Sequence, residues 1–200
     1  MIKVNLLTVD TDNTDHVNFL YEVIKYRWDH HDITNIPYKV SRIMPTFDEH
    51  QNAVKSKRYK HHYIIKLGDV MIGSCYIDHE DVYGIFLLPK YVKQALKKYK
   101  KKNTELATRP EPLSVLAFKV MVLLHPEIKT FYAKVNPKNT LSRSVMIRGG
   151  HQEEEITLSI KSVDGKIKNG LWPDWSLMGK YRDDKHFKPR RNFFKLIFKR

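Results

Sequence analysis

The chain has 200 residues, 42% of them hydrophobic, which is enough to build one sizeable core. Its formal net charge of +14 is concentrated in residues 93–102 and 180–200, and such a field attracts nucleic acid, anionic membranes or phosphorylated cofactors. The single cysteine, Cys75, excludes an internal disulfide, and no apolar stretch reaches the roughly 18 residues of a membrane span. We therefore expect a cytoplasmic protein without a transmembrane segment.

The N-terminal part of the chain predicts one strand followed by two helices. Residues 2–7 are typical of a strand, and apolar residues recur at helical spacing over residues 17–28. Residues 30–38 are polar and aperiodic, which is typical of a loop. Thr46 and Glu49 have the spacing of a capping box, so a second helix is expected to begin there.

The next segment predicts an antiparallel meander and a buried helix. Residues 62–66, 70–77 and 82–88 are apolar, β-branched or aromatic, and short polar turns separate them. The almost continuous apolar run over residues 113–124 predicts a helix that packs on a sheet. His61 and His62 begin a strand, so we expect them on opposite faces, where they cannot chelate an ion together.

Residues 125–150 predict a strand, a turn and a helix with defined ends. The strand is stopped by Pro137, and Asn139 is a candidate helix N-cap with Ser142 three residues later. Gly150 is placed to end this helix.

Further strands are predicted over residues 152–160 and, with interruptions, around residues 167–177. The resulting order, β α α β β β α β α β, indicates an α/β (α+β) fold with a mixed, mostly antiparallel central sheet flanked by helices. We assign residues 1–178 to one domain and residues 179–200 to a basic, aromatic tail. The aromatic residues of the tail either pack on the domain or contact nucleic acid, a membrane surface or a partner protein.

Three sequence blocks resemble the GNAT acetyltransferase superfamily. The Pro-x-Asn-x-x-Ser element over residues 137–142 follows a strand as it does in that family, and residues 44–50 with 58–66 and the segments around Gly73 and Gly84 are similar to bacterial members. The resemblance implies an enzyme that uses acetyl-CoA or another acyl-CoA as co-substrate. The acyl group would pass by direct attack to a primary amine of an amino-sugar or a modified nucleic-acid base.

The resemblance also implies a groove beside strand 82–88, where backbone N–H groups bind pantetheine and polarise the acyl carbonyl. Asn139 and Ser142 would line this groove, although they could instead only cap their helix. The implied cofactor-binding residues are Ile85, Phe86, Leu87, Leu88, Lys93, Asn139 and Ser142.

Two features depart from the family pattern. The glycine-containing pyrophosphate loop that follows this strand in the family is replaced by a lysine-rich insert at about residues 92–109. The lysines either hold CoA phosphates, bind another polyanion after loss of the cofactor, or face water on a helix. Met146 occupies the position of the tyrosine that protonates the departing thiolate in the family.

Acyl transfer to an amine requires a base close to strand 82–88. The catalytic candidates are His79, Glu80, Asp81 and Tyr83, and the alternative is that residues 78–81 form only a polar turn. The substrate-binding candidates, where the family's first helices cover the acceptor, are His30, His31 and Asp32. No Cys/His set has metal-ligand spacing, so no metal is predicted.

The competing hypothesis is a GNAT-derived protein that binds or modifies nucleic acid and no longer uses acyl-CoA. Its contacts would come from residues 93–102 and 180–200, where lysine and arginine are densest.

Overall fold

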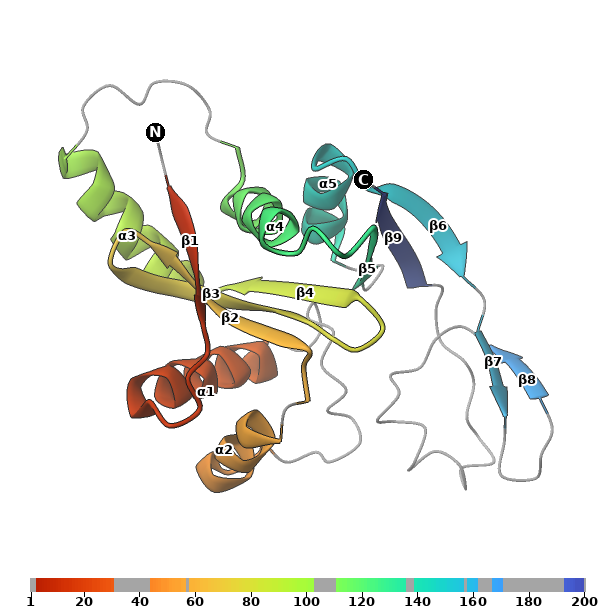
Figure 1. Ribbon diagram of the computed structural model, residues 1–200, viewed down its shortest axis with the longest axis horizontal. Coiled ribbons are helices and arrows are strands. Elements are labelled where there is room, and N and C mark those ends of the chain that lie inside the picture. The colour runs from red at the N-terminus through yellow and green to blue at the C-terminus, as the bar shows by residue number, and fades with distance from the viewer. Residues whose placement is uncertain are drawn as a thin grey trace. The chain divides into compact units, whose positions relative to one another are not determined.

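The computed structural model describes residues 3–30, 44–56, 58–102, 111–135, 139–156, 158–161, 167–170 and 193–199. Helices and strands share the chain (Figure 1), in the order β1 (Val4–Thr8), α1 (Thr14–Asp29), α2 (Phe47–Lys55), β2 (His61–Leu67), β3 (Val70–Ile77), β4 (Val82–Leu87), α3 (Pro89–Lys102), α4 (Leu113–Leu124), β5 (Thr130–Val135), α5 (Thr140–Arg148), β6 (Gln152–Ile156), β7 (Leu158–Lys161), β8 (Ile167–Gly170) and β9 (Phe193–Lys199).

The predicted fold class is confirmed, with three differences in detail. The single strand predicted over residues 152–160 is divided into β6 and β7, which pair with different strands. The sequence predicted a single helix between β4 and β5, whereas the structure has two, because α3 occupies most of the lysine-rich insert. Residues 103–109 of that insert lie outside the described part of the chain. Residues 193–199, which the sequence analysis assigned to the tail, form β9.

Contacts group the chain into two compact units. Unit 1 comprises Met1–Tyr26, Pro45–Phe131 and Lys199–Arg200, and unit 2 comprises Arg27–Met44 and Tyr132–Phe198. Among the described residues, none of the helices combines the length and the apolar character needed to cross a membrane.

Strands β1 to β4 form a continuous antiparallel sheet in unit 1, which confirms the predicted meander. In its register Ile64 lies between Leu7 and Ser74, and Cys75 lies between Tyr63 and Ile85. Paired residues of antiparallel strands point to the same face, so these two rows of side chains cover opposite faces of the sheet.

Gly73 permits the close contact between β3 and β4. A Cβ atom at this position would collide with the backbone carbonyl oxygen of Phe86. The glycine in this apolar strand therefore marks a close backbone approach.

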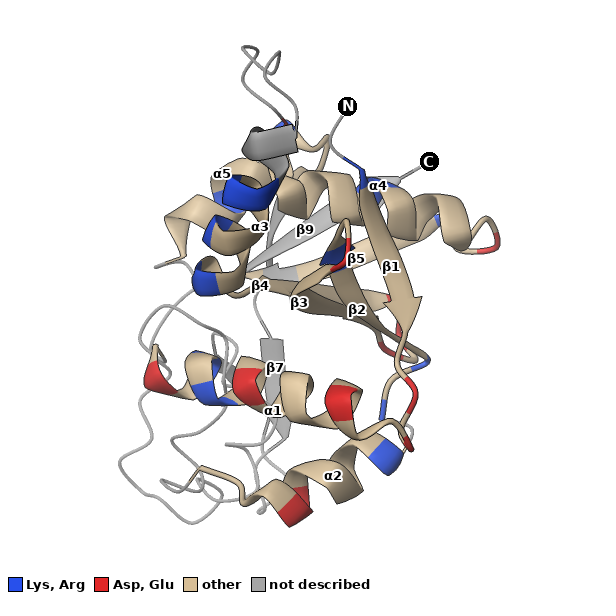
Figure 2. Cartoon of the chain, turned by 90° about the vertical axis from the view of Figure 1, so that its left-hand side faces the viewer, with Lys and Arg blue, Asp and Glu red and all other residues tan. Residues whose placement is uncertain are grey.

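One face of the sheet is covered by α1, and α2 packs beside α1 (Figures 1 and 2). Phe19, Leu20 and Val23 of α1 form a buried cluster with Ile64 of β2 and Leu88 after β4. These α1 residues have the spacing of one helix face, and Leu20 is the one among them from which the helical spacing was predicted.

Helix α2 begins with the capping box that the sequence predicted. The carboxylate of Glu49 accepts the Thr46 N–H at 2.8 Å, and the Thr46 hydroxyl accepts the Glu49 N–H at 3.2 Å. Two backbone donors that the helix leaves unpaired are thereby satisfied.

The opposite face of the sheet is covered by α4. Phe118 stacks on Tyr83 of β4, with ring centroids 4.7 Å apart, and meets Phe131 of β5 edge-on at 5.7 Å. Ala117 and Met121 of the same helix are completely buried. Burial of this apolar helix against the sheet is thus confirmed.

Unit 2 contains α5 and two strand pairs. Asn139 caps α5 by accepting the Ser142 N–H at 3.1 Å, and Gly150 follows the helix with φ of 93°, so both predicted helix boundaries are confirmed. Strand β6 pairs antiparallel with β9, and β7 pairs antiparallel with β8.

His62 should make folding sensitive to acid. It lies on the α1 face of β2, and burial, with a smaller contribution from His50, lowers the pKa of His62 from 6.5 to about 4. Between pH 6.5 and 4 the unfolded chain therefore binds a proton that the folded chain does not. The free energy of unfolding is expected to fall through this range by up to about 3 kcal/mol from this group.

Urea unfolding at pH 7 and pH 4.5 measures this loss. His62→Phe keeps a ring beside Tyr59, whose centroid is 5.0 Å away, and should lose distinctly less stability between the two pH values than the wild type. His79→Gln changes an exposed histidine and should lose as much as the wild type. An equal loss in His62→Phe would show that His62 is not the acid-sensitive group.

Candidate functional site

Strand β4 presents its backbone groups alternately to its two edges. The Leu88 N–H donates to the Ile72 carbonyl at 2.8 Å, and the Val82 carbonyl accepts the Asp78 N–H at 2.9 Å, so even-numbered residues face β3. Because successive peptide groups of a strand point in opposite directions, the amides of Ile85 and Leu87 face the edge away from β3. Phe86 and Leu88, predicted alongside them, direct their amides toward β3.

The side chains of β4 lie on the two faces of the sheet. Phe86 packs beside Tyr26 of α1, with ring centroids 5.9 Å apart. Tyr83, a catalytic candidate that the sequence could not assign to a face, points to the α4 side and is only 2% exposed. Burial raises the pKa of Tyr83 well above its ordinary value, so its phenol is neutral within the core.

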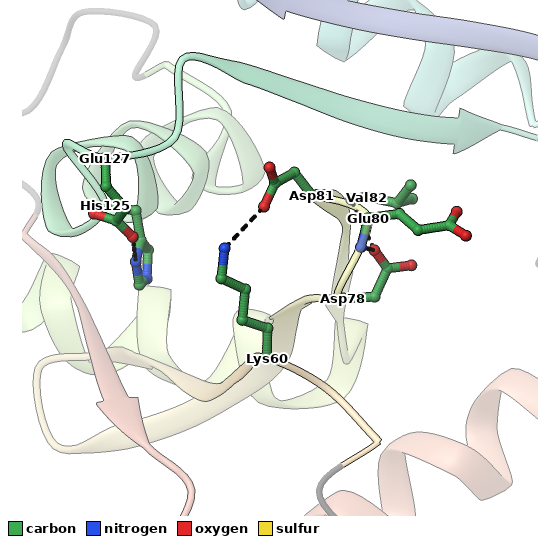
Figure 3. Close-up of polar contacts among 7 residues, drawn as sticks. All are labelled: Lys60, Asp78, Glu80, Asp81, Val82, His125 and Glu127. Carbon is green, nitrogen blue, oxygen red and sulfur yellow. Dashed lines mark hydrogen bonds and ion pairs between the residues drawn. The ribbon is translucent and has the colours of Figure 1, made fainter.

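The turn between β3 and β4 holds the other three catalytic candidates, of which Figure 3 shows Glu80 and Asp81. The Asp78 carboxylate accepts the N–H groups of Glu80 and Val82, each at 2.9 Å. Asp81 adopts φ of 58°, a left-handed conformation that aspartate tolerates, and its carboxylate pairs with Lys60 at 3.2 Å. These contacts are those of a polar turn, which was the alternative interpretation, and they leave His79 and Glu80 exposed.

Helix α3 begins where the family has its phosphate-binding loop. It starts at Pro89, a residue suited to the first turn, and the Leu88 carbonyl accepts the amides of Tyr91 and Val92, each at 3.0 Å. The Tyr91 hydroxyl donates to Glu22 of α1 at 2.6 Å, and this hydrogen bond is the main cause that raises the pKa of Tyr91. The α3 backbone is therefore fixed as a helix anchored on α1.

The lysines of α3 lie on a helix without acidic residues (Figure 2). Lys93, the predicted cofactor contact, and Lys97 are exposed and one helical turn apart. Lys98 approaches Asp69 at 3.9 Å. The solvated helix, one of the three alternatives for the insert, matches what the structure describes of these three side chains.

The remaining predicted residues are not in β4 or its turn. Asn139 is the N-cap of α5 and Ser142 lies in its first turn, both in unit 2. Their role beside a cofactor stays a prediction. His30 follows the last turn of α1. The other two substrate candidates, His31 and Asp32, lie outside the described residues.

A polar cluster that the sequence analysis missed lies on the α4 face of unit 1. The Tyr63 hydroxyl and His125 Nε2 are 2.8 Å apart, and His125 Nδ1 lies 3.0 Å from a Glu127 carboxylate oxygen. The His61 ring centroid is 4.0 Å from that of His125. The only signal of this cluster in the sequence is the strand alternation that puts His61 and Tyr63 on one face. Nothing local connects them to His125, because His125 follows 62 residues after Tyr63.

The electrostatics of this cluster follow from burial and from neighbouring charges. Burial, followed by the nearby His125 and Lys60, lowers the pKa of His61. Burial raises the pKa of the Tyr63 phenol. The pKa of Glu127 is lowered mainly by its own backbone N–H and by its hydrogen bond with His125. Near neutral pH the cluster therefore combines an anionic carboxylate with a neutral His61 imidazole and a neutral phenol.

An aromatic stack on the α1 face was also missed. Tyr59 stacks on Tyr76 of β3 with ring centroids 4.1 Å apart. The Tyr76 ring lies over Gly84 of β4, where a Cβ atom would come within 2.5 Å of it. Gly84, which lies in one of the segments that resemble the GNAT family, thus makes room for an aromatic side chain.

Comparison with solved structures identifies the fold. RimL, a ribosomal L7/L12 α-N-protein acetyltransferase solved with CoA, aligns with TM-score 0.56 and 13% identity, covering 98% of this chain and 93% of its own. The spermidine N-acetyltransferase of Vibrio cholerae, solved with CoA and spermine, aligns with TM-score 0.57 and 11% identity over 98% of this chain and 95% of its own.

A GNAT-family acetyltransferase of Bacillus anthracis aligns with TM-score 0.52 and 15% identity, over 99% of this chain and 97% of its own. No protein-family model matches the chain, and no curated protein matches it in sequence. At these identities the similarity lies in the arrangement of helices and strands. The chain therefore has the fold of the GNAT acetyltransferase superfamily, as its sequence blocks predicted.

Proposed function

We propose that the chain is an acyl-CoA-dependent N-acyltransferase that acts on a primary amine. The observation that carries the proposal is the GNAT fold over the length of the chain, shared with structures that contain CoA. Supporting it, Ile85 and Leu87 direct their amides away from β3, to the edge of β4 on which β5 is the next strand of the sheet. These two amides are the proposed donors to the pantetheine arm and the acyl carbonyl.

The proposed reaction is a direct transfer. The amine nitrogen attacks the thioester carbonyl carbon, the C–N bond forms, the C–S bond breaks and CoA leaves as the thiolate. A carboxylate accepts the proton of the amine, and Asp81 and Glu80 at the start of β4 are the proposed bases. The thioether of Met146 cannot donate a proton, so solvent or another group must protonate the CoA thiolate.

The charge of the protein favours one class of acceptor. A net charge of +14 repels a free polyamine and attracts an amine carried by a phosphorylated molecule. Amino-sugar nucleotides and amine-bearing nucleic-acid bases both meet this condition. We therefore propose an anionic amine carrier as the acceptor.

Two measurements test the function itself. Calorimetry should detect acetyl-CoA binding, and a thiol-release assay should show turnover with an amine from a panel of amino-sugars, their nucleotide derivatives and amine-bearing nucleotides. Absence of acetyl-CoA binding at millimolar concentration would contradict the proposal. Binding of nucleic acid in that case would favour the competing hypothesis of a protein that no longer uses acyl-CoA.

Asp81 and Lys60 provide a matched pair of variants for the proposed base. Asp81→Asn keeps the left-handed turn, because asparagine tolerates this conformation, but removes the basic oxygen. We expect kcat to fall by at least about 100-fold, since general-base catalysis typically contributes that much. Lys60→Met breaks the same ion pair and keeps the carboxylate, so kcat should change only a few-fold.

Comparing kcat and the unfolding midpoint of these variants distinguishes a catalytic role of Asp81 from a role in turn stability alone. If Asp81 only closes the turn, Asp81→Asn and Lys60→Met will lower the unfolding midpoint alike and leave kcat unchanged. Glu80→Gln tests the second carboxylate in the same assay. Wild-type kcat in Asp81→Asn, Glu80→Gln and their combination would eliminate both proposed bases.

The exposed lysines of α3 are the proposed substitute for the missing phosphate loop. Lys93→Gln combined with Lys97→Gln should weaken acetyl-CoA binding by about three- to tenfold, as expected for exposed charge pairs. The difference from the wild type should shrink as salt rises from 50 to 500 mM, because salt screens such contacts. Isothermal calorimetry at the two salt concentrations measures both effects.

Lys119→Gln is the control for this experiment. Lys119 lies on α4 and pairs with Glu111 at 2.6 Å. Its substitution also lowers the net positive charge of the chain but leaves α3 unchanged. Its effect on acetyl-CoA affinity should be small. Equal losses in the α3 variant and in Lys119→Gln would attribute the effect to net charge and reject a phosphate contact on α3.

A further inference from the structure

Three side chains with metal-binding atoms converge on the α4 face of unit 1. His61 comes from the first residue of β2, His125 ends α4, and Glu127 follows in the turn that leads to β5. Each offers one ligand atom, and these atoms all lie within 4.8 Å of one another. Figure 3 shows His125 and Glu127 side by side, with Lys60 directed toward Asp81.

One of the three separations is already close to that around a bound ion, and the other two are no larger than 4.8 Å. Ligands at about 2.1 Å around a tetrahedral zinc lie about 3.4 Å apart. His125 Nδ1 and the Glu127 oxygen are already 3.0 Å apart. The adjustment that remains falls on His61 and on Glu127, whose side chain is 54% exposed and is held only by His125 and its own backbone N–H. His125, at 6% side-chain exposure, supplies the fixed point.

Tyr63 gives His125 a partner suited to metal binding. A metal on Nδ1 requires the proton of His125 to sit on Nε2, and the Tyr63 hydroxyl, 2.8 Å from Nε2, can accept it. Ligating histidines usually donate their second N–H to such a partner, which fixes the ring and its tautomer. Without a metal, the other tautomer satisfies both contacts, because Nδ1–H can donate to Glu127 and the Tyr63 hydroxyl can donate to Nε2.

The charges around the cluster also permit a cation. Lys60 carries the adjacent positive charge, but its ammonium is paired with Asp81 at 3.2 Å. The Glu127 carboxylate supplies the negative charge of the ligand set. His62, the neighbour of His61 in sequence, takes no part, because it lies on the opposite face of β2 and packs against Tyr59.

We propose that His61, His125 and Glu127 bind one divalent transition-metal ion of the zinc type, with Tyr63 as the group that orients His125. Two imidazoles and one carboxylate exclude a preference for Mg²⁺ or Ca²⁺, which take oxygen ligands. Three protein ligands leave the fourth tetrahedral position to water. The site joins the end of α4 to the start of β2, and it does not depend on the proposed acyl transfer.

The test is metal binding by the full chain after treatment with chelator. Calorimetry with Zn²⁺ should give one ion per chain, and Co²⁺ should give the intense visible absorption bands of a tetrahedral site. Zn²⁺ should also raise the melting temperature, because it binds only the folded arrangement. His61→Gln and Glu127→Gln should each abolish the Co²⁺ bands.

Tyr63→Phe tests the orienting role. It should keep the Co²⁺ bands while lowering affinity by about 10- to 100-fold, as for other partners of metal-ligating histidines. His79→Gln removes an exposed histidine outside the cluster and should bind Zn²⁺ as the wild type does. Glu127 is exposed enough that its substitution should not unfold the chain, so that variant keeps the test valid even if His61→Gln misfolds.

Three results would overturn the site. They are absence of Zn²⁺ and Co²⁺ binding at hundred-micromolar metal, retention of the Co²⁺ bands in Glu127→Gln, and loss of affinity in His79→Gln equal to that in His61→Gln. None of these measurements involves acetyl-CoA. Failure of the metal site is therefore distinguishable from failure of the proposed acyltransferase function.

Discussion

The register of β2, β3 and β4 is the constraint on which the rest of unit 1 depends. It places His62 and Ile64 under α1 and α2, and His61 and Tyr63 under α4. A slip of one residue would exchange the two sets and bury both in the wrong surroundings. Gly73 holds this register tightly, because only a residue without a Cβ fits against the Phe86 carbonyl.

The same register decides what β4 can offer to a ligand. Even-numbered residues direct their backbone groups to β3, so Ile85 and Leu87 are the positions that present amides to the other edge. The turn that starts β4 is stabilised by Asp78 and by the Lys60–Asp81 pair. The Asp81 carboxylate at the start of β4 is thereby held in place by contacts that also stabilise the turn. A substitution there can change both the stability of the turn and kcat, so the two must be measured together.

Helix α3 changes how a phosphorylated ligand can be held. A glycine loop recognises phosphate with fixed backbone N–H groups, whereas α3 commits its early amides to the Leu88 carbonyl. What the helix offers instead is the charge of long, solvated side chains such as Lys93 and Lys97. Such contacts are weaker, less directional and more sensitive to salt than a backbone cradle.

The sequence by itself determined most of the helices and strands and their order, because helical spacing, strand composition, the Thr46 capping box and the Asn139 cap are local properties. Helix α3 and strand β9 were not part of the predicted order. It also placed His61 and His62 on opposite faces, since alternation is a property of any strand. Only the tertiary structure brought His125 and Glu127 to His61 and Tyr63, and Tyr76 over Gly84. Contacts between distant segments depend on how helices and strands pack, and the local pattern of residues does not encode that packing.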